Sequence, residues 1–276
     1  MHDVILKLLR CPVCGEDLSM DEQGKLCRCN RVPPHCFDPS RSGYLNLEGG
    51  RHGEGDGKAA VRARRAFLDA GYYQPLSDDL NGLLGDLGAS LVLDAGCGEG
   101  YYTNRMASGR DVLGIDLSKE GVDLAAKKAK AEGTRASFCV ASLFSLPIKD
   151  QSFDVVTNLF APCAEEEFLR VLKDGGYLIL VGAGAEHLMG LKRVLYDMPR
   201  KNLGREDLPR SMELVATHRV RYPFTVKGRE EIEALFSMTP YYWRTSKADR
   251  AKLEPLEELT AEADFDVFMY RKGGAT

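Results

Sequence analysis

The sequence predicts an α/β protein built on a doubly wound, mostly parallel sheet, with a small cysteine-rich module in front of it. Two observations carry this prediction. Between residues 90 and 185, short apolar runs alternate with helix-like segments, a pattern typical of βαβ units. Five of the eight cysteines lie within the first 36 residues, a stretch too short to bury much of a core of its own.

The cysteine-rich module spans residues 1–37 and contains the knuckle Cys11-Pro12-Val13-Cys14. A Cys-x-x-Cys turn sets two thiolates on one side of the chain, and a second pair further along completes a tetrahedron. In a reducing compartment such a cluster indicates a metal rather than disulfides, and no thioredoxin-like pattern favours a redox dithiol. We expect a structural zinc ion held by Cys11, Cys14, Cys29 and His35, with Cys27 and Cys36 as alternatives for the last two.

Residues 38–60 are rich in glycine, arginine and serine, and we expect a flexible linker there. A helix is predicted over 59–70, and Tyr72-Tyr73-Gln74-Pro75 begins a second helix that runs towards Leu87. These helices open the main domain, which we assign to residues 61–276.

The main domain continues with alternating strands and helices. Strands are predicted at 91–94, 112–116, 137–141, 154–159 and 177–182, and helices at 101–108, 119–132 and 164–172, with a turn at 173–176. The remainder predicts helices at 186–198 and 228–237 and a final strand at 264–270. In such a sheet, ligands bind at the carboxyl ends of the strands.

The loop after the first of these strands reads Asp94-Ala95-Gly96-Cys97-Gly98-Glu99-Gly100, and Asp116 ends the second strand. Glycines let a ligand lie against the backbone, and the helix that follows directs free N–H groups at it. Asp116 is placed to accept hydrogen bonds from a ribose diol. The spacing differs from the Gly-x-Gly-x-x-Gly of pyrophosphate-binding loops, and Glu99 repels a pyrophosphate but suits an ammonium or sulfonium group. A nicotinamide cofactor is therefore disfavoured.

This loop resembles that of the class I S-adenosylmethionine-dependent methyltransferases, and the resemblance implies their Rossmann-like fold. In it, the glycines and Glu99 hold the methionine part, Asp116 holds the ribose, and a residue pair after the third strand lies beside the adenine. The implied cofactor-site residues are Asp94, Gly96, Gly98, Glu99, Asp116, Ala141 and Ser142. A glycine-rich turn without a ligand is the plain alternative.

Specific strings along nearly the whole chain extend the resemblance. They are Cys11–Cys14, His35–Asp38, Gly43–Leu47, Arg64–Tyr73, Asp94–Thr103, Phe160–Cys163, His187–Met189 and Met238–Trp243. In this order they are similar to the bacterial 23S ribosomal RNA guanine-N1-methyltransferase family (the RlmA family). The chain departs from the family pattern at the metal site, where five residues instead of three separate Cys29 from His35, which leaves the ligand set open.

The family resemblance implies methyl transfer from S-adenosylmethionine to N1 of a guanine in a 23S ribosomal RNA hairpin. It adds Tyr73 and His187 to the cofactor site and places Asn158, at the end of the fourth strand, where the target base is held. A strand-end cap is the alternative role for Asn158. Aromatic side chains stack on unpaired RNA bases, and we expect such faces from Tyr72, Tyr241, Tyr242 and Trp243, which otherwise pack in the core.

Two other functions compete with this one. A methyltransferase that acts on a small molecule, such as a quinone or lipid precursor, would use the same cofactor loop but leaves the zinc module unexplained. A non-enzymatic zinc-ribbon RNA-binding protein would not need an intact glycine loop. Residues 25–65 carry nine Lys/Arg against four Asp/Glu, and residues 192–250 carry thirteen against eight, so two basic stretches flank the core. Contact with RNA phosphates and ordinary solvated surface charge explain these stretches equally well.

Net charge and the distribution of apolar residues limit the class of protein and the cellular compartment that fit this sequence. The net charge of −4 argues against a generally basic nucleic-acid binder. No apolar run approaches the roughly 20 residues that span a bilayer, and the first residues do not resemble a signal peptide, so we expect a cytoplasmic protein without a membrane partner. A homodimer is expected if one RNA hairpin needs more basic surface than a monomer offers, and the sequence leaves this open.

Overall fold

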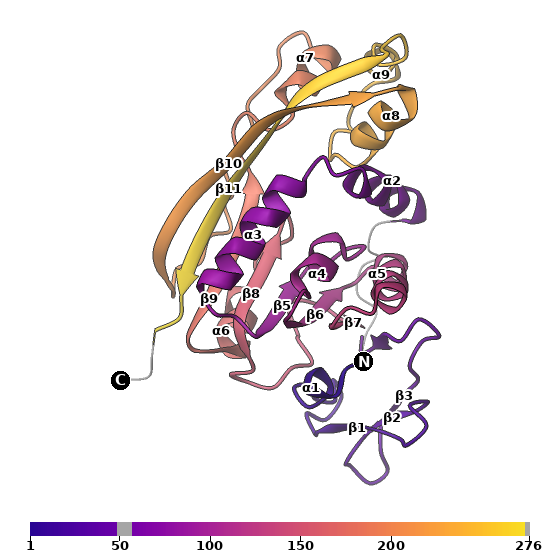
Figure 1. Ribbon diagram of the computed structural model, residues 1–276, viewed down its shortest axis with the longest axis vertical. Coiled ribbons are helices and arrows are strands. Elements are labelled where there is room, and N and C mark those ends of the chain that lie inside the picture. The colour runs from indigo at the N-terminus through magenta and orange to yellow at the C-terminus, as the bar shows by residue number, and fades with distance from the viewer. Residues whose placement is uncertain (49–56, 274–276) are drawn as a thin grey trace.

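The computed structural model describes residues 1–48 and 57–273. Its centre is a mixed eight-stranded sheet with the order β10-β11-β9-β8-β5-β6-β7-β4 (Figure 1). The strands from β4 to β9 run parallel, whereas β11 pairs antiparallel with β9 and β10 antiparallel with β11. The strands are β4 (Leu45–Asn46), β5 (Leu91–Ala95), β6 (Asp111–Asp116), β7 (Ala136–Val140), β8 (Phe153–Leu159), β9 (Leu172–Ala183), β10 (Glu213–Lys227) and β11 (Glu258–Arg271).

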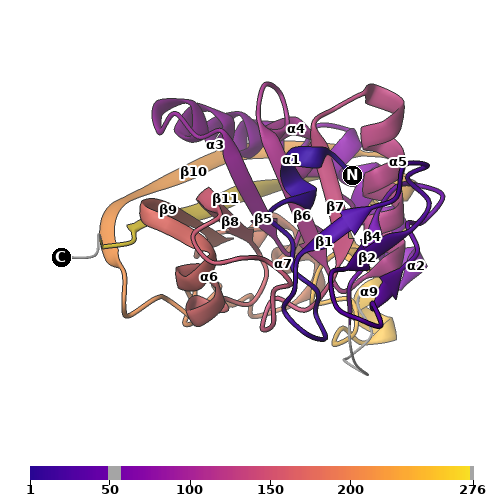
Figure 2. The same cartoon turned by 90° about the horizontal axis from the view of Figure 1, so that it is seen from below.

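Helices cover both faces of the sheet, with one apolar cluster on each face. Figure 2 shows α3 and α4 on one side and α6 on the other. The first cluster joins Phe67, Leu80 and Val122 to the sheet, and the second joins Ile5 and Phe168 to it. The helices are α1 (Asp3–Leu6), α2 (Lys58–Asp69), α3 (Gln74–Asp86), α4 (Tyr101–Met106), α5 (Lys119–Glu132), α6 (Glu165–Val171), α7 (Met189–Leu195), α8 (Arg229–Ser237) and α9 (Lys247–Ala251). Strands β5 and β6 are buried on both faces of the sheet. This burial explains why their sequences are mostly apolar without alternating polar residues.

The predicted strands and helices between residues 91 and 172 are present with small shifts at their ends. Strand β9 differs, because it begins at Leu172 and contains the predicted turn. Gly175 has a φ of 75°, and the pairing with β8 shifts between Phe153 and Val155, so the extra residues are taken up as an irregularity within the strand. The prediction of a turn that ends before the strand was therefore wrong.

The C-terminal third departs most from the sequence prediction. Strand β10 was missed, β11 is longer than expected, α7 is shorter, and α9 was missed. Most β10 side chains are exposed, and Pro223 lies within the strand. A largely exposed edge strand lacks the apolar alternation that identifies strands, and an edge tolerates proline. In Figure 1 the β10–β11 pair runs from the sheet to the end of the molecule that holds α7, α8 and α9.

The N-terminal module forms its own three-stranded antiparallel sheet from β1 (Leu18–Met20), β2 (Cys27–Cys29) and β3 (Cys36–Phe37). It lies at the opposite end of the molecule from α7–α9 (Figure 1). Ile5 and Leu9 are fully buried in the same apolar cluster as the sheet residues Leu93 and Leu113. The module is therefore packed against the main domain.

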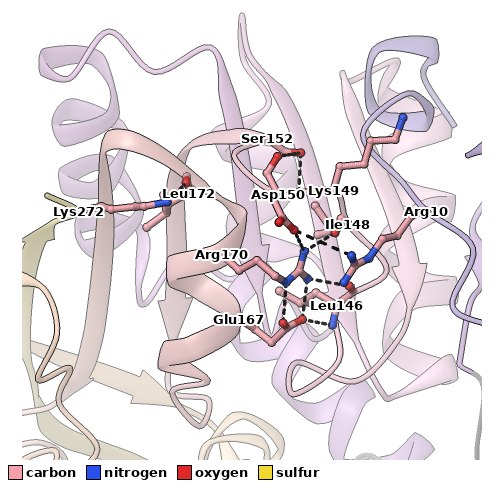
Figure 3. A network of polar contacts seen from close by, with 10 residues as sticks. All are labelled: Arg10, Leu146, Ile148, Lys149, Asp150, Ser152, Glu167, Arg170, Leu172 and Lys272. Carbon is pink, nitrogen blue, oxygen red and sulfur yellow. Dashed lines mark hydrogen bonds and ion pairs between the residues drawn. The ribbon is translucent and has the colours of Figure 1, made fainter. Parts of the chain in front are cut away.

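Backbone and charge contacts also join the module to the segment before β8. Leu9 pairs with Ile148 as an isolated β-bridge, and the Arg10 N–H donates to the Pro147 carbonyl at 3.0 Å. Arg10 lies 4.0 Å from the Asp150 carboxylate, which also accepts a 2.7 Å hydrogen bond from Arg170 (Figure 3). Arg170 in turn donates to Glu167, so one network of charges links the module to α6.

The segment expected to be a linker is partly structured. Residues Leu45–Asn46 form β4, which pairs with β7 at the edge of the main sheet, and Leu45 and Leu47 are buried. Their apolar side chains explain this, because they fill the edge of the core. The glycine-rich stretch at 49–56 lies outside the described residues.

Among the helices that are described, none is long and apolar enough to cross a membrane.

Candidate active site and metal centre

A cavity of about 1080 Å³, here called the main cavity, lies at the carboxyl ends of β5, β6 and β8. The glycine loop 96–99 and Asp116 form one wall. The segments 159–162 and 202–205, with Asp207, form another, and Tyr73 and His187 also line the space. Exposed aromatic side chains border it: Phe144 is 66%, Phe160 48% and Trp243 83% exposed. The cavity is large enough for a nucleoside-sized ligand together with a second ring.

The glycine loop is shaped by close packing. Gly96 has a φ of 90°, and a methyl group placed on it would lie only 2.4 Å from the Ala161 Cβ. Gly100 has a φ of 77°, and the corresponding group would lie 2.5 Å from the Ala125 Cβ. Larger residues are therefore excluded at both positions, both by backbone conformation and by space. Gly96 and Gly98 line the main cavity, and their contact with the methionine part of a donor stays a prediction.

Asp116 is the acid that organises this loop. Its carboxylate accepts hydrogen bonds from the Gly98 N–H at 2.9 Å and from the Ser118 N–H at 2.8 Å. Its side chain is only partly buried and lines the main cavity. A carboxylate has about four lone-pair sites, so it can hold both N–H groups and still accept from a ligand diol.

Asp94 is almost fully buried and accepts hydrogen bonds from the hydroxyls of Thr103 at 2.5 Å and Thr157 at 3.1 Å. Burial raises the pKa of Asp94 to about 6, against the opposing effect of these two hydrogen bonds. Both hydroxyl partners come from core elements, α4 and β8, so Asp94 ties the glycine loop to the sheet as well as lining the main cavity.

Glu99 is the least satisfied acid of the main cavity. It is 5% exposed, and its Oε2 accepts no hydrogen bond from the described residues, although Arg64 lies 3.8 Å away. Burial raises the pKa of Glu99 to about 7, while the Arg64 charge opposes the shift. A buried carboxylate oxygen without a hydrogen-bond donor is costly to maintain. It fits a cationic ligand group, such as the ammonium of S-adenosylmethionine.

Tyr73 and His187, which are far apart in sequence, meet in the cavity wall. The Tyr73 hydroxyl and His187 Nε2 are 3.2 Å apart, and the Asp264 N–H donates to His187 Nδ1 at 3.3 Å. Burial lowers the pKa of His187 to about 4, so the imidazole is neutral at pH 7. The neutral ring therefore carries its proton on Nε2 and donates to Tyr73.

The predicted adenine-side pair lies slightly off the cavity. Ala141 is fully buried, and its N–H donates to the Asp116 carbonyl, whereas the Ser142 hydroxyl accepts from the Phe144 N–H. The next two residues, Leu143 and Phe144, line the main cavity instead. The chain turns after β7 and brings these later side chains to the surface of the cavity, and contact of Ala141 and Ser142 with the adenine stays a prediction.

Asn158 is the residue predicted to hold the target base. It is fully buried and does not line the main cavity. Its amide donates to the carbonyls of Ala95 at 2.8 Å and Pro162 at 3.3 Å, and its Oδ1 accepts from Arg205 at 2.6 Å. These bonds use both N–H groups and one lone pair of the amide within the protein, which favours the alternative role of a strand-end cap, and contact with the guanine edge stays a prediction. Asn158 caps the strand and fixes the segment that follows it.

Sequence reasoning missed Arg205 and Asp207, which lie in the cavity wall between α7 and β10. The Arg205 side chain is 7% exposed, and its guanidinium donates to the Ala161 carbonyl at 2.7 Å and to Asp207 at 2.7 Å. This stretch has no periodic pattern or motif, so the sequence carries no signal for either residue. Phe160, with a left-handed φ of 55°, was singled out only as part of a string.

The metal centre brings together Cys11, Cys14, Cys29 and His35, whose ligand atoms all lie within 4.8 Å of one another. Cys14 Sγ lies 3.7 Å from Cys29 Sγ, and Cys11 Sγ lies 3.5 Å from His35 Nδ1. Tetrahedral zinc at ordinary bond lengths separates two sulfur ligands by about 3.8 Å. The cluster therefore fits zinc, with four protein ligands and no open position, which is typical of a structural site.

The alternative ligands lie outside this cluster. Cys27 is fully buried on β2, and burial raises the pKa of its thiol to about 11, which favours the protonated form. Cys36 is exposed, and its sulfur lies 3.9 Å from the Pro34 carbonyl. Compared with the family pattern, two additional residues separate Cys29 from His35. The turn between β2 and β3 accommodates them and still returns His35 to the cluster.

Comparison with known proteins agrees with this architecture. Residues 92–176 match the family described as "Methyltransferase domain". The chain is 32% identical to YxjB of Bacillus subtilis (strain 168), provisionally named a 23S rRNA (guanine-N(1)-)-methyltransferase, over 98% of this chain and 99% of that protein. It is 30% identical to the 23S rRNA (guanine(748)-N(1))-methyltransferase of Streptomyces fradiae, over 97% of this chain and 98% of that protein.

The similarity includes the cysteine-rich module, the sheet and the C-terminal hairpin, because these alignments cover nearly all of both chains. The predicted fold class, a Rossmann-like methyltransferase sheet with an N-terminal module that can hold zinc, is confirmed. This chain belongs to the family of 23S rRNA (guanine-N(1)-)-methyltransferases.

Proposed function

We propose that this protein transfers a methyl group from S-adenosylmethionine to N1 of a guanine in a 23S ribosomal RNA hairpin. The observation that carries the proposal is the combination of a main cavity suited to the donor with relatives of this activity that match the chain from end to end. A match confined to the sheet would support only a methyltransferase of unspecified substrate. The cytoplasm, where ribosomal RNA is made in bacteria, is the proposed location.

The residues proposed to hold the donor line one side of the main cavity. S-adenosylmethionine supplies an electrophilic methyl group on a sulfonium. Glu99 faces the ammonium, Asp116 accepts from the ribose diol, and the Gly96–Gly98 backbone supports the methionine part. Leu143 and Phe144 offer apolar surface to the adenine, and the His187–Tyr73 pair closes the wall. These side chains position the reactants and exclude water, which is the main contribution an enzyme makes to such a displacement.

The target base enters from the side bordered by aromatic rings. N1 of a paired guanine is hidden in the helix, so the base must be unpaired or flipped out. Phe160 and Trp243 are exposed around the cavity and can stack on the extruded base or its neighbours.

Two parts of the chain are proposed to have separate roles. Residues 1–37 present the RNA, with a zinc ion held by Cys11, Cys14, Cys29 and His35, and residues 61–276 carry out the transfer. Exposed basic residues of the module, such as Arg28 and Arg31, are suited to contact phosphates. We also propose that the protein forms a homodimer. Light scattering with and without the hairpin tests this by measuring the mass of the particle in solution.

Mapping of reverse-transcriptase stops tests the function, because a methyl group on N1 blocks Watson–Crick pairing. Ribosomal RNA from cells with and without the gene is compared, and purified protein is then incubated with unmodified RNA and labelled donor. A stop at one guanine that depends on the protein supports the proposal, and position 748, named in one relative, is the first to inspect. Transfer of label to a small molecule and not to RNA would contradict it.

A further inference from the structure

Leu203 is an apolar side chain that is kept in solvent at the edge of the main cavity. It is 83% exposed and lines the cavity from the segment between α7 and β10. Single exposed leucines are common on protein surfaces and have no functional meaning by themselves. Leu203 differs from these, because the backbone on both sides of it is fixed by buried groups. None of the roles proposed above uses it.

Asn202 fixes the backbone immediately before Leu203. Its N–H donates to the Ala185 carbonyl at 3.0 Å. Its side-chain amide donates to the carbonyls of Gly184 at 3.0 Å and His187 at 2.9 Å. These three bonds tie the segment to the turn that follows β9. Because Asn202 and His187 both line the main cavity, the bonds hold Leu203 at the edge of that space.

A buried lysine holds the other end of the same amide. Lys192 Nζ donates to Asn202 Oδ1 at 2.6 Å and to the Arg200 carbonyl at 2.9 Å. Lys192 is only 5% exposed, and among the described residues it forms no ion pair with a carboxylate. Burying a cation without an opposite charge is costly, and here bonds to neutral groups of the 200–202 segment offset that cost. The position of Leu203 is therefore built into the fold.

Arg205 fixes the backbone after Leu203, with only Gly204 between them. The Arg205 side chain is 7% exposed and donates to Asn158 Oδ1 at 2.6 Å and to the Ala161 carbonyl at 2.7 Å. Leu203 thus lies between two anchored residues and cannot turn into the core unless these bonds break. The hydrophobic effect favours a partner that covers such a side chain.

Two cations precede Leu203 in the chain and favour a polyanion as this partner. Arg200 and Lys201 are exposed, and Lys201, whose side chain is 70% exposed, forms a 2.6 Å ion pair with Glu186. An apolar side chain beside exposed cations suits a nucleic acid, which offers phosphates on its outside and apolar base faces within its stack. It suits the centre of a protein interface less, because charged residues are depleted there.

Trp243 places a second exposed side chain at the same cavity. It is 83% exposed, and the hydroxyl of Tyr241, two residues before it, donates to Asn202 Oδ1 at 3.0 Å. The Asn202 amide therefore joins the turn that carries Trp243 to the segment that carries Leu203. An aromatic ring stacks on a base, whereas an aliphatic side chain acts as a wedge between two bases.

We infer that Leu203 enters the RNA stack at the place that the target guanine leaves, and so keeps that base in the main cavity; this rests on the proposed function. A base that turns out of a stack leaves its neighbours without contact on one face, and restacking draws it back. An apolar side chain in the gap contacts both neighbours and blocks the return, as wedge residues do in kinked DNA. Base faces are alike in this respect, so Leu203 holds the target without selecting it.

The first test uses the full-length protein with S-adenosylhomocysteine and a hairpin that carries 2-aminopurine at the target position. The fluorescence of this base rises when it leaves a stack. The wild type is compared with Leu203→Ala and with Leu203→Met, which keeps an apolar side chain of similar volume. Met198→Ala is the matched control, because Met198 is 85% exposed on the same segment but does not line the main cavity. Only Leu203→Ala is expected to reduce the rise in fluorescence.

The second test measures single-turnover methylation of two hairpins. One has the natural sequence, and the other has abasic sites on both sides of the target guanine, so that no stack remains to be opened or filled. On the natural hairpin, Leu203→Ala is expected to be about 10- to 100-fold slower than the wild type, because part of the unstacking cost is no longer offset. On the abasic hairpin, the two proteins are expected to react at similar rates. Affinity for S-adenosylhomocysteine is expected to be unchanged.

The inference is overturned if Leu203→Ala shows the wild-type fluorescence and rate, or if its defect is the same on the abasic hairpin, since Leu203 would then act outside the stack. A lower particle mass of Leu203→Ala in light scattering would also overturn it, because a second copy of the chain would be the partner. Since Leu203 is exposed, the variant is expected to fold, which circular dichroism checks. A wild type that does not methylate the natural hairpin would instead refute the proposed function.

Discussion

Glu99 is the residue whose surroundings most clearly call for a charged partner. Its buried Oε2 accepts no hydrogen bond among the described residues, and the cation of Arg64 is 3.8 Å away. The cost of such an oxygen falls when a ligand ammonium is bound next to it. This makes the ionisation of Glu99 sensitive to occupancy of the cavity.

Cofactor affinity should therefore depend on pH through Glu99. Burial raises the pKa of Glu99 to about 7, so the group is neutral below that pH and charged above it. A bound ammonium favours the charged form, and affinity for S-adenosylhomocysteine should rise from about pH 6 to pH 8 more in the wild type than in Glu99→Gln. Calorimetry across this range checks it, and equal pH dependence of the two proteins would place the ammonium elsewhere.

The same shift has a consequence for folding. The pKa of Glu99 is raised in the folded state, so the folded protein keeps a proton that the unfolded chain has lost. The stabilising contribution is complete below the unfolded value and is lost as the pH rises towards 7. The charged form that the donor requires is thus the less stable form of the empty protein.

Asp116→Ala should weaken binding of S-adenosylhomocysteine by about 1–3 kcal/mol, the loss of charge-assisted hydrogen bonds. Part of the loss comes from the loop, because the variant also frees the N–H groups of Gly98 and Ser118. Titration calorimetry measures the change. Asp123→Ala, which removes an acid from α5 outside the main cavity, is the control and should leave affinity as it was.

At the scale of elements, the β10–β11 hairpin supports the cavity wall from outside the parallel sheet. Arg219 on β10 forms an ion pair with the fully buried Asp264 on β11. The Asp264 carboxylate accepts from the Glu186 N–H at 2.8 Å, and the Asp264 N–H donates to His187. The hairpin therefore positions His187, and through it Tyr73.

Arg219→Ala should lower the free energy of unfolding by about 1–3 kcal/mol, because the buried Asp264 carboxylate loses its ion-pair partner while the partly exposed Arg219 is itself well solvated. Urea denaturation followed by circular dichroism measures the change. Arg221→Ala alters an arginine of the same strand that has no ion pair with Asp264 and should cost much less. Equal effects of the two variants would show that the pair does not stabilise the fold.

The elements also show how far the sequence can predict this structure. Strands β5 to β8 were found because they are buried on both faces and form unbroken apolar runs. Strand β10 was missed because its side chains are mostly exposed, and β4 because two residues carry no period. The acids of the glycine loop follow a local string, whereas Arg205 and Asp207 reach the cavity only through the tertiary path of a segment without a pattern.

At the scale of the whole molecule, the N-terminal module is joined to the main domain by buried contacts. Leu9 is buried against the sheet, its backbone pairs with Ile148, and Arg10 adds a charge contact with Asp150. The ligands Cys11 and Cys29 are buried in the apolar cluster that includes Ile5 and Leu9, and none of the four metal ligands lines the main cavity. Loss of the metal should therefore loosen the module before it affects the main cavity.

Cys11→Ser should release zinc and reduce RNA binding while affinity for S-adenosylhomocysteine stays nearly unchanged, because the ligands lie apart from the main cavity. Metal analysis of the purified proteins, gel-shift titration with the hairpin and calorimetry check the three quantities. Cys36→Ser is the matched control, since this exposed thiol lies outside the cluster. Simultaneous loss of RNA and cofactor binding in Cys11→Ser would contradict the division into two parts.

The bridge between Leu9 and Ile148 fixes the span between the module and the cavity. With the module binding the hairpin as proposed, this fixed distance selects the target nucleotide by its separation from the bound part of the hairpin. A stem lengthened by a few base pairs would carry the natural guanine past the cavity, and methylation should then shift to another base or stop.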